Sequence, residues 1–149
     1  MAYRNTASFG KRQEYIAVAE LLKRGFDVYM TLVDDQGIDC IVRLDRPVPV
    51  YLDIQIKARS ASAKNPGTFA AMNIQDPRPN YFFIFYSEGA DTYWILPSQD
   101  VLDKGNINKE GINAGKCRIV FTNTLKDGTV KPRPKWAEYQ NAFHLLTEY

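Results

Sequence analysis

The chain has 149 residues, of which 45% are hydrophobic and 24% charged, and its formal net charge is +2. A chain of this length and composition buries one core of ordinary size, so we expect one folded domain over residues 1–149. The composition excludes a disordered or repetitive chain, and a charge of +2 is too small to indicate a polyanion partner by itself.

The first predicted element is an amphipathic helix over residues 8–25. Gly25 provides a C-terminal stop, and the apolar residues recur at helical spacing: Ala17, Val18, Leu21 and Leu22. At about 100° per residue, Glu14 falls in the middle of this apolar arc. We therefore expect a carboxylate on the side of the helix that faces the core.

Three strand-like runs follow, at residues 26–33, 38–44 and 50–59. Turn-forming residues at 34–37 and 46–49 separate them, and such short connections favour an antiparallel meander. In the third run, the alternation of a strand separates two faces. One is apolar (Leu52, Ile54, Ile56, Ala58), and the other is polar (Asp53, Gln55, Lys57, Arg59).

Further strands are predicted at residues 69–74, 81–86 and 92–96. The run YFFIFY at 81–86 lacks alternation, which indicates a strand covered on both faces. A short helix with Ser98 as its capping residue comes next, then a last strand at 116–121 and a C-terminal helix over about 135–147. The fold class is therefore α/β, with a mixed, mainly antiparallel β-sheet flanked by helices.

Targeting and redox features are sparse. No apolar run approaches the roughly 20 residues that span a bilayer, and the N-terminal stretch lacks the apolar centre of a signal peptide. We therefore expect a cytoplasmic protein with no membrane segment. Cys40 and Cys117 lie in apolar strand-like runs without a CxxC partner, which favours core packing over metal binding.

Three features occur in a fixed order: Glu14 on the first helix, Gly37-Ile38-Asp39 before the second strand, and Gln55-Ile56-Lys57 in the third. This order resembles the PD-(D/E)XK, or restriction-endonuclease-like, nuclease superfamily in its QxK variant. The chain is similar to archaeal Holliday-junction resolvases and to uncharacterised stand-alone bacterial relatives. The likeness covers residues 10–59 through GKRQE, GIDCIV and LDIQIKAR, while YFFIFY and TYWILP resemble later strands of those relatives.

The resemblance implies an αβββ core with a C-terminal helix and a metal-dependent nuclease that hydrolyses phosphodiester bonds, with DNA as the expected nucleic acid. Mg²⁺ or Mn²⁺ would be held by Asp39, the Gln55 amide, the Ile56 carbonyl and Glu14, since hard cations take oxygen ligands. Lys57 would orient or deprotonate the attacking water. Phosphate contacts are expected at Arg59, Lys11 and Arg12, and a homodimer is expected because many nucleases of this fold pair to cut two strands.

Other interpretations remain open at this point. Gln55 replaces the commoner glutamate with a neutral amide, which allows a weak or inactive module that binds nucleic acid or a protein partner. Taken singly, Glu14 suits a helix N-terminus, Asp39 a turn, and the polar strand face a solvated edge. A basic stretch is either a solvated loop or a DNA-backbone contact: Lys126, Lys131, Arg133 and Lys135.

Overall fold

Helix α1, Ala2–Lys23, opens the fold. The computed structural model describes residues 2–33 and 36–149, and for residues 2–5 the backbone alone. The helix begins before the predicted residue 8 and ends at Lys23, and the predicted stop residue Gly25 follows with a φ of +89°, which suits a residue without a Cβ. Phe26 N–H donates to Leu21 O and Gly25 N–H to Leu22 O, both at 3.0 Å. These bonds satisfy carbonyls at the helix end and turn the chain toward the sheet.

A five-stranded sheet forms the centre of the molecule, in the order β1-β2-β3-β5-β6. Its strands are β1 Asp27–Met30, β2 Cys40–Leu44, β3 Val50–Arg59, β5 Tyr81–Ser87 and β6 Thr92–Pro97. β1, β2 and β3 form the predicted antiparallel meander, and β5 pairs with β3 in parallel and with β6 in antiparallel. The sheet is therefore mixed and mainly antiparallel. Of the turn expected at 34–37, residues 34 and 35 lie outside the described residues.

Smaller elements build a second layer. β4 Thr68–Met72, β7 Asn106–Ile107 and β8 Cys117–Val120 form a three-stranded sheet, and α2 Ser98–Lys104 connects β6 to β7. β9 Thr122–Thr124 and β10 Val130–Pro132 form a hairpin. The strand predicted at 116–121 is β8, but it is not the last one. β9 and β10 are too short and too exposed to show a strand pattern in the sequence.

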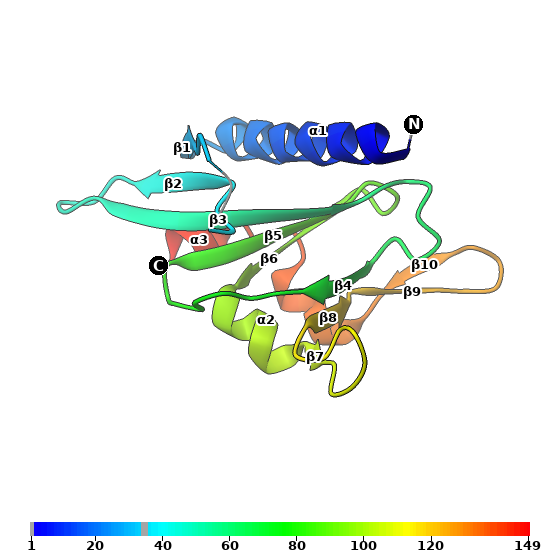
Figure 1. Cartoon of the computed structure of the whole chain (residues 1–149). Helices are drawn as coiled ribbons and strands as arrows, with labels where there is room; N and C mark the ends of the chain where they lie inside the picture. The colour runs from blue at the N-terminus through cyan, green and yellow to red at the C-terminus, as the bar shows by residue number, and fades with distance from the viewer. Residues whose placement is uncertain (1, 34–35) are drawn as a thin grey trace.

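The central sheet carries a hydrophobic core on each face. Figure 1 shows α1 above the sheet, and α2, β4, β7 and β8 below it. The upper core contains α1 residues together with Cys40, Val42, Leu52, Ile54 and Ile84. The lower core is largely aromatic and includes Phe69, Phe83, Phe85, Trp94, Phe121 and Trp136. Every residue of β5 is buried, as the unbroken apolar run predicts.

The buried face of α1 differs from the predicted one by a small rotation. Leu22, expected in the core, is 55% exposed, and Gln13 is buried with 1% exposure. Gln13 Nε2 donates to Glu88 Oε2 at 2.6 Å, so a polar bond to the turn after β5 holds this position inside. Glu14 consequently lies at the border of the buried face rather than in its middle.

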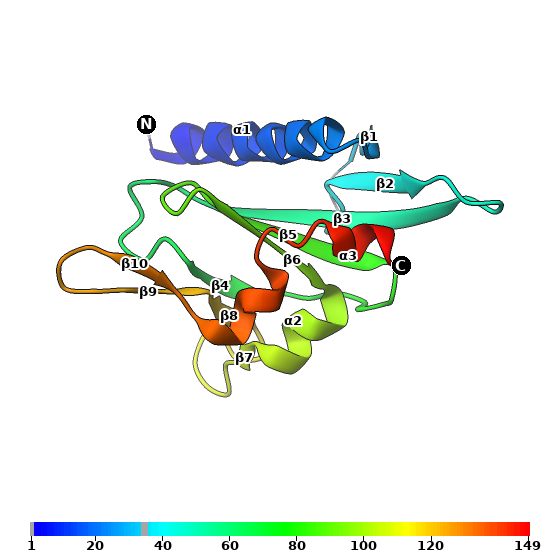
Figure 2. The same cartoon turned by 180° about the vertical axis from the view of Figure 1, so that it is seen from behind.

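The predicted C-terminal helix is wrong over most of its length. A 3₁₀ helix, η1 Pro134–Tyr139, and one turn of α-helix, α3 His144–Thr147, replace it. Asn141 breaks the helix with a φ of 50°, and its backbone N–H donates to Tyr93 O while its side-chain oxygen accepts from Tyr93 N–H. Docking onto the edge strand β6 therefore outweighs helix continuation. Figure 2 shows this segment in orange and red, returning along the sheet to the C-terminus.

Ser98 also differs from its predicted role. It is the first residue of α2, and Pro97 occupies the cap position without a side-chain bond. The Ser98 hydroxyl instead accepts from Arg78 N–H and donates to Arg78 O, at 3.1 and 3.0 Å. It fastens the loop before β5 to the start of α2.

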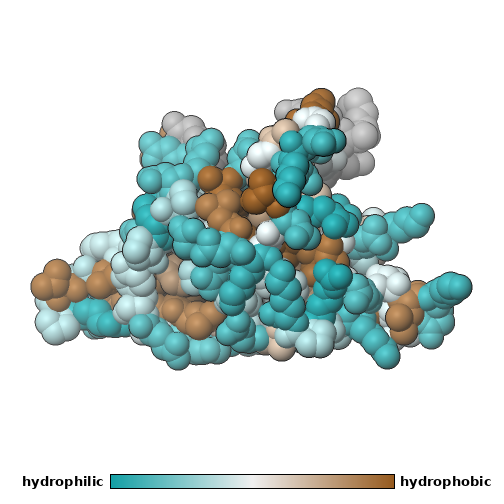
Figure 3. Space-filling view, turned by 90° about the horizontal axis from the view of Figure 1, so that it is seen from below, coloured by the Kyte–Doolittle hydropathy of each residue, from teal (hydrophilic) through white to brown (hydrophobic). Residues whose placement is uncertain are grey.

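The surface is mixed. Figure 3 shows the molecule from below, where hydrophilic residues surround separate hydrophobic areas. None of the helices described in the structure combines the length and the hydropathy needed to cross a bilayer.

Candidate functional site

Strand β3 positions the predicted site residues as its alternation requires. Ile54 and Ile56 are buried in the core beneath α1. Asp53, Gln55 and Lys57 are half-buried on the opposite face. The QxK pair therefore shares one face of one strand.

Asp39 lies at the edge of β3, where β2 has not yet begun. Cys40 is the first residue of β2 and pairs with Ile54, and Asp39 N–H donates to Ile54 O at 2.8 Å. The Asp39 carboxylate, in a residue 6% exposed, accepts from Ile56 N–H through Oδ2 at 2.6 Å. The carboxylate thus contacts the residue between Gln55 and Lys57.

The Ile56 carbonyl points to this same edge. Odd-numbered residues of β3 bond toward β5, because Asp53 N–H donates to Asn80 O and Arg59 O accepts from Glu88 N–H. Since the N–H and C=O of one strand residue point to the same side, those of Ile56 face Asp39. The Asp39 carboxylate and the Ile56 carbonyl, two of the four predicted metal ligands, are therefore adjacent.

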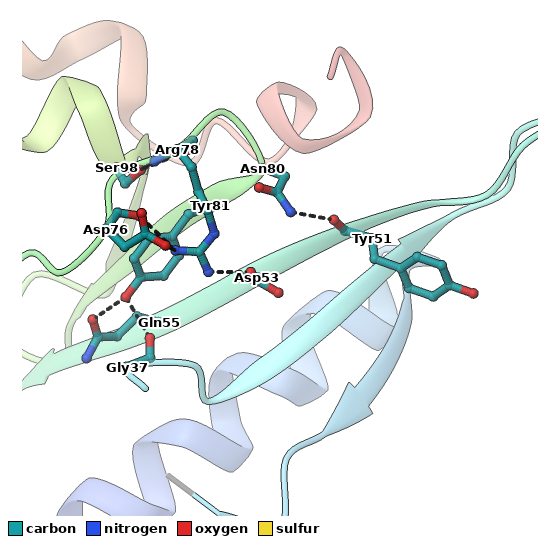
Figure 4. Close-up of polar contacts among 9 residues, drawn as sticks. All are labelled: Gly37, Tyr51, Asp53, Gln55, Asp76, Arg78, Asn80, Tyr81 and Ser98. Atoms are coloured by element: carbon teal, nitrogen blue, oxygen red, sulfur yellow. Dashed lines mark hydrogen bonds and ion pairs between the residues drawn. The ribbon is translucent and has the colours of Figure 1, made fainter. Parts of the chain in front are cut away.

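Gln55 belongs to a cluster with Tyr81 and Gly37 (Figure 4). The Tyr81 hydroxyl is the donor to two oxygens, Gln55 Oε1 at 2.8 Å and the Gly37 carbonyl oxygen at 2.7 Å. Gly37 has a φ of +69°, and a Cβ there would stand 2.9 Å from the Tyr81 hydroxyl. Glycine is needed at this position both for its backbone conformation and for this close approach.

A cavity of about 330 Å³ opens on this face of β3. It is lined by Gly37, Gln55, Lys57, Ala71, Met72, Asn73, Gln75 and Tyr81. Lys57 and Gln55 thus share one cavity, whereas Asp39 and Glu14 are not among its lining residues. β4 borders the cavity with a register shift between Phe69 and Met72, where Ala71 takes a φ of 56°.

Glu14 approaches the site from α1. Its side chain is 16% exposed and pairs with Lys11 Nζ at 3.0 Å. Burial, followed by the charges of Asp39 and Glu14, raises the pKa of the Cys40 thiol to about 12. The negative charges of both carboxylates therefore raise the pKa of the same buried thiol. Within the described part of the chain, Glu14 forms no hydrogen bond or ion pair with Gln55 or Lys57.

The candidate ligand atoms are of the type that a hard cation binds, but together they carry little negative charge. They comprise the Asp39 and Glu14 carboxylates, the Ile56 carbonyl and the Gln55 amide, all oxygen donors of the type that Mg²⁺ takes alongside water. Within the described residues, no group of three or more His, Cys, Asp or Glu side chains gathers to hold an ion. Any cation here would keep several waters.

The three predicted nucleic-acid contacts differ in their surroundings. Lys11 and Arg12 lie on the exposed side of α1 and pair with Glu14 and Glu88, each at 3.0 Å. Arg59 ends β3, and its guanidinium donates to Asn65 O at 3.4 Å. All three are engaged with other parts of the chain in this structure.

Two buried polar residues, Tyr81 at the site and Gln13 on α1, were missed in the sequence. Tyr81 opens an unbroken apolar run, and only the parallel pairing of β5 with β3 shows that its hydroxyl reaches Gln55. Gln13 precedes Glu14 in α1. A predicted buried face of the helix centred one residue earlier would have included it. Both cysteines are buried and free, as core packing predicts.

Comparison with solved structures finds this fold in a bacterial homing endonuclease, I-Ssp6803I. The two chains share 21% identity and a TM-score of 0.63 over 93% of this chain and 91% of that chain. A nuclease from a fusselovirus is similar over 91% of this chain and 86% of that one, at 14% identity and a TM-score of 0.46. No protein-family model and no curated protein sequence matches the chain. The first likeness establishes a nuclease-like α/β fold.

Proposed function

We propose that this protein is a metal-dependent nuclease that hydrolyses phosphodiester bonds, with DNA as its substrate, and that it is a QxK member of the PD-(D/E)XK superfamily. The observation that carries the proposal is the 2.6 Å bond from Ile56 N–H to the Asp39 carboxylate. It brings the aspartate of the second feature, Gly37-Ile38-Asp39, to the strand that carries Gln55 and Lys57. The fold shared with a homing endonuclease supports the same conclusion.

In this proposal, Mg²⁺ or Mn²⁺ is held by Asp39, the Ile56 carbonyl and the Gln55 amide, with Glu14 binding through water or a second ion. When bound, the ion supplies polarisation of a phosphoryl oxygen and a lowered pKa of its water. Asp39 is prepared for this role because Ile56 N–H fixes one of its oxygens in place. Glu14 must leave its ion pair with Lys11, whose side chain is 63% exposed and long enough to turn toward a phosphate.

Lys57 supplies the positive charge at the reacting centre. Among the described residues it makes no ion pair, and it projects into the cavity beside Gln55. An ammonium there orients the attacking water and offsets the charge that builds on the scissile phosphate. Arg59, Lys11 and Arg12 would hold flanking phosphates through their positive charges.

A second candidate is a nuclease-fold module that binds nucleic acid or a protein partner without turnover. The observation that favours it is the low charge of the ligand set, because Gln55 is neutral and Lys11 neutralises Glu14. Metal binding distinguishes the two candidates. A catalytic protein binds Mn²⁺ in an Asp39-dependent manner, and a module that has lost turnover does not.

The test compares the wild type with Asp39→Asn on supercoiled plasmid, linear duplex and four-way-junction DNA, with Mg²⁺ or Mn²⁺ and then with EDTA. Asparagine retains an oxygen that can accept the Ile56 N–H bond, so the variant removes charge while keeping the local structure. We expect cleavage to fall about a hundredfold or more, since even outer-shell partners of a metal typically contribute 10–100-fold.

Asp45→Asn is the matched control, because Asp45 is 88% exposed in the turn after β2. It should cleave as the wild type does. Equal activity of wild type and Asp39→Asn would contradict the assigned site. Absence of cleavage of all three substrates by a folded wild type would favour the binding module.

The remaining parts of the proposal are a homodimer that presents two sites to two strands and a location in the cytoplasm. The mass of the protein in solution, measured by light scattering with and without duplex DNA, tests the dimer. A monomer under both conditions would contradict it.

A further inference from the structure

Three hollows follow one another along the end of β3. Beyond Ile54, no strand pairs with β3 on its β2 side within the described residues. The candidate active-site cavity lies along this stretch, and Lys57 lines both that cavity and a smaller hollow of about 220 Å³. Ala58 and Arg59 line both the smaller hollow and a third one of about 470 Å³. The three hollows therefore form one path along the unpaired edge of β3.

The third hollow, which we call the outer cavity, lies where the N-terminal half of α1 passes over the end of β3 (Figure 1). Its described lining includes the aromatic ring of Phe9, the guanidinium of Arg59 and three hydroxyl residues: Thr6, Ser60 and Ser62. Its volume lies in the range of pockets that enclose a small organic ligand. A ring, a cation and hydroxyls together suit a nucleotide, whose base is flat and whose phosphate is an anion.

The charge along the path has one sign. Among the described residues that line the three hollows, the charged ones are both cations, Lys57 and Arg59. They lie two residues apart on the polar face of β3, which is about 6.8 Å along a strand. Two positive charges in line, with no acidic residue beside them in this lining, favour a ligand whose negative charges repeat along its length. A nucleic-acid strand has this property.

Arg59 has few partners within the chain. Its guanidinium donates to Asn65 O at 3.4 Å, and among the described residues it makes no ion pair. Its Nε–H is buried and finds no acceptor in the described part of the chain. A buried unsatisfied donor costs free energy, whereas a phosphate accepts from two N–H groups of one guanidinium. Arg59 would therefore gain hydrogen bonds by turning to a bound phosphate.

The serines and the ring of the outer cavity complete the contacts that a nucleotide needs. Ser60 Oγ and Ser62 Oγ lie 2.9 Å apart, and one of them donates to the other. This bond uses one of the two hydroxyl hydrogens, so the second is available to a phosphate oxygen. Phe9 is half-buried, with the Arg12 guanidinium 5.3 Å from the centre of its ring. A ring held in this way provides a surface on which a base can stack.

From this arrangement we infer that the outer cavity binds one unpaired nucleotide of the DNA strand that is cut, with its base on Phe9 and its phosphate on Arg59 and the Ser60–Ser62 pair. The inference rests on the proposed function, because the strand reaches the outer cavity by passing Lys57. Bases inside a duplex have both faces covered by their neighbours, so only an unstacked base presents a face to the ring. The substrate class is therefore DNA with unpaired nucleotides next to the scissile phosphate.

The first experiment measures binding in EDTA, so that metal-dependent cleavage does not interfere. Fluorescence anisotropy compares a short thymidine single strand with a duplex of the same length. We expect Phe9→Leu to lower the ratio of single-strand to duplex affinity about tenfold, which is within the range of one base–aromatic stack. Phe9→Tyr retains the ring and should keep the ratio of the wild type. An unchanged ratio in folded Phe9→Leu would overturn the inference.

Tyr15→Leu is the matched control. Tyr15 lies on the same helix, is 60% exposed and lines none of the three hollows, so the loss of its ring should leave the ratio unchanged. An equal fall of the ratio in Tyr15→Leu and Phe9→Leu would show that the effect does not arise in the outer cavity, and it would also overturn the inference.

The second experiment separates this inference from the proposed function. It measures cleavage, with Mn²⁺, of a duplex that carries a short single-stranded gap and of the same duplex without a gap. The wild type should cut the gapped DNA about tenfold faster or more, and this ratio should fall toward one in Phe9→Leu. Equal rates in the wild type would overturn the inference and leave the proposed function intact. Cleavage of neither DNA, together with Phe9-dependent single-strand binding in EDTA, would overturn only the proposed function.

Discussion

The two ends of the polar face of β3 are built for different tasks. At one end, the Asp53 carboxylate pairs with Arg78 at 2.5 Å, and the two side chains are only 17% and 27% exposed. Asn80 Nδ2 adds a bond to Tyr51 O, so the loop before β5 is fastened to β3 (Figure 4). At the other end, Gln55 and Lys57 border a cavity.

The difference lies in where the charge is neutralised. Asp53 meets its opposite charge within the chain, so its interaction stabilises the fold and leaves nothing for a ligand. Lys57 makes no ion pair among the described residues and is half-buried beside a cavity, and in the proposed function its partner there is a phosphate. One strand face thus divides into a structural half and a half available for chemistry, and substitutions should separate the two.

The largest effect is expected at Lys57. Lys57→Met should lower the rate of DNA cleavage by about 10²–10³-fold, because it removes an ammonium placed at the developing charge. Thermal stability should remain unchanged, since no ion pair is lost. Lys64→Met, at an exposed lysine of the loop after β3, is the control and should retain cleavage. An equal loss in both variants would indicate general weakening of DNA binding instead.

Arg78 should show the reverse pattern. Arg78→Met leaves the Asp53 carboxylate half-buried without its partner, and we expect the free energy of unfolding in urea to fall by about 2 kcal/mol, less than for a fully buried pair. Cleavage should change by no more than a few-fold. Asp53→Asn in the same chain should recover part of the loss, because the stranded charge is removed. A large loss of cleavage without loss of stability would place Arg78 in the site.

A second satisfied polar cluster, distant from the site, predicts a smaller effect. The Tyr139 hydroxyl donates to Asp100 Oδ2 at 2.6 Å and fastens η1 to α2. Tyr139→Phe should lower the free energy of unfolding by about 1 kcal/mol at pH 7, with cleavage unchanged.

The same variant has a predicted pH dependence. Burial, and then the bond to Asp100, raise the pKa of Tyr139 to about 12 in the folded protein, above the ordinary tyrosine value of 10.0. The contribution of this phenol is therefore complete below pH 10 and is lost as the pH rises toward 12. The difference in the free energy of unfolding between wild type and Tyr139→Phe, measured by urea titration, should decrease over that pH range. A constant difference would contradict the assigned pKa shift.

The smallest effect is expected at Arg59, whose guanidinium bonds to Asn65 O at the end of β3. Arg59→Ala should weaken DNA binding a few-fold and reduce the slope of log affinity against log salt by about 0.9 if it contacts one phosphate. Fluorescence anisotropy at several salt concentrations measures this slope. An unchanged slope would leave Arg59 as a support of the loop after β3.

Local pattern determined a large part of this protein. Alternation in residues 50–59 predicted β3 and its two faces, the unbroken run at 81–86 predicted a strand buried on both sides, and Gly25 predicted the helix end. Each of these depends on contacts between near neighbours or on one backbone conformation, so the residues themselves carry the information. The order of the motifs also predicted that Asp39 would meet the third strand, and its carboxylate accepts the Ile56 N–H bond.

Only the tertiary structure decided the rest. The C-terminal helix breaks because Asn141 gains bonds to Tyr93, a residue distant in sequence. The buried face of α1 includes Gln13, because its side chain bonds to Glu88 in the turn after β5. Leu22, which was expected in the core, is exposed. Tyr81 reaches Gln55 because β5 pairs with β3 in parallel, and pairing between distant strands is set by packing of the whole molecule rather than by local propensity. The residues that we assign to the site were therefore readable in the chain, while the partners that orient them were not.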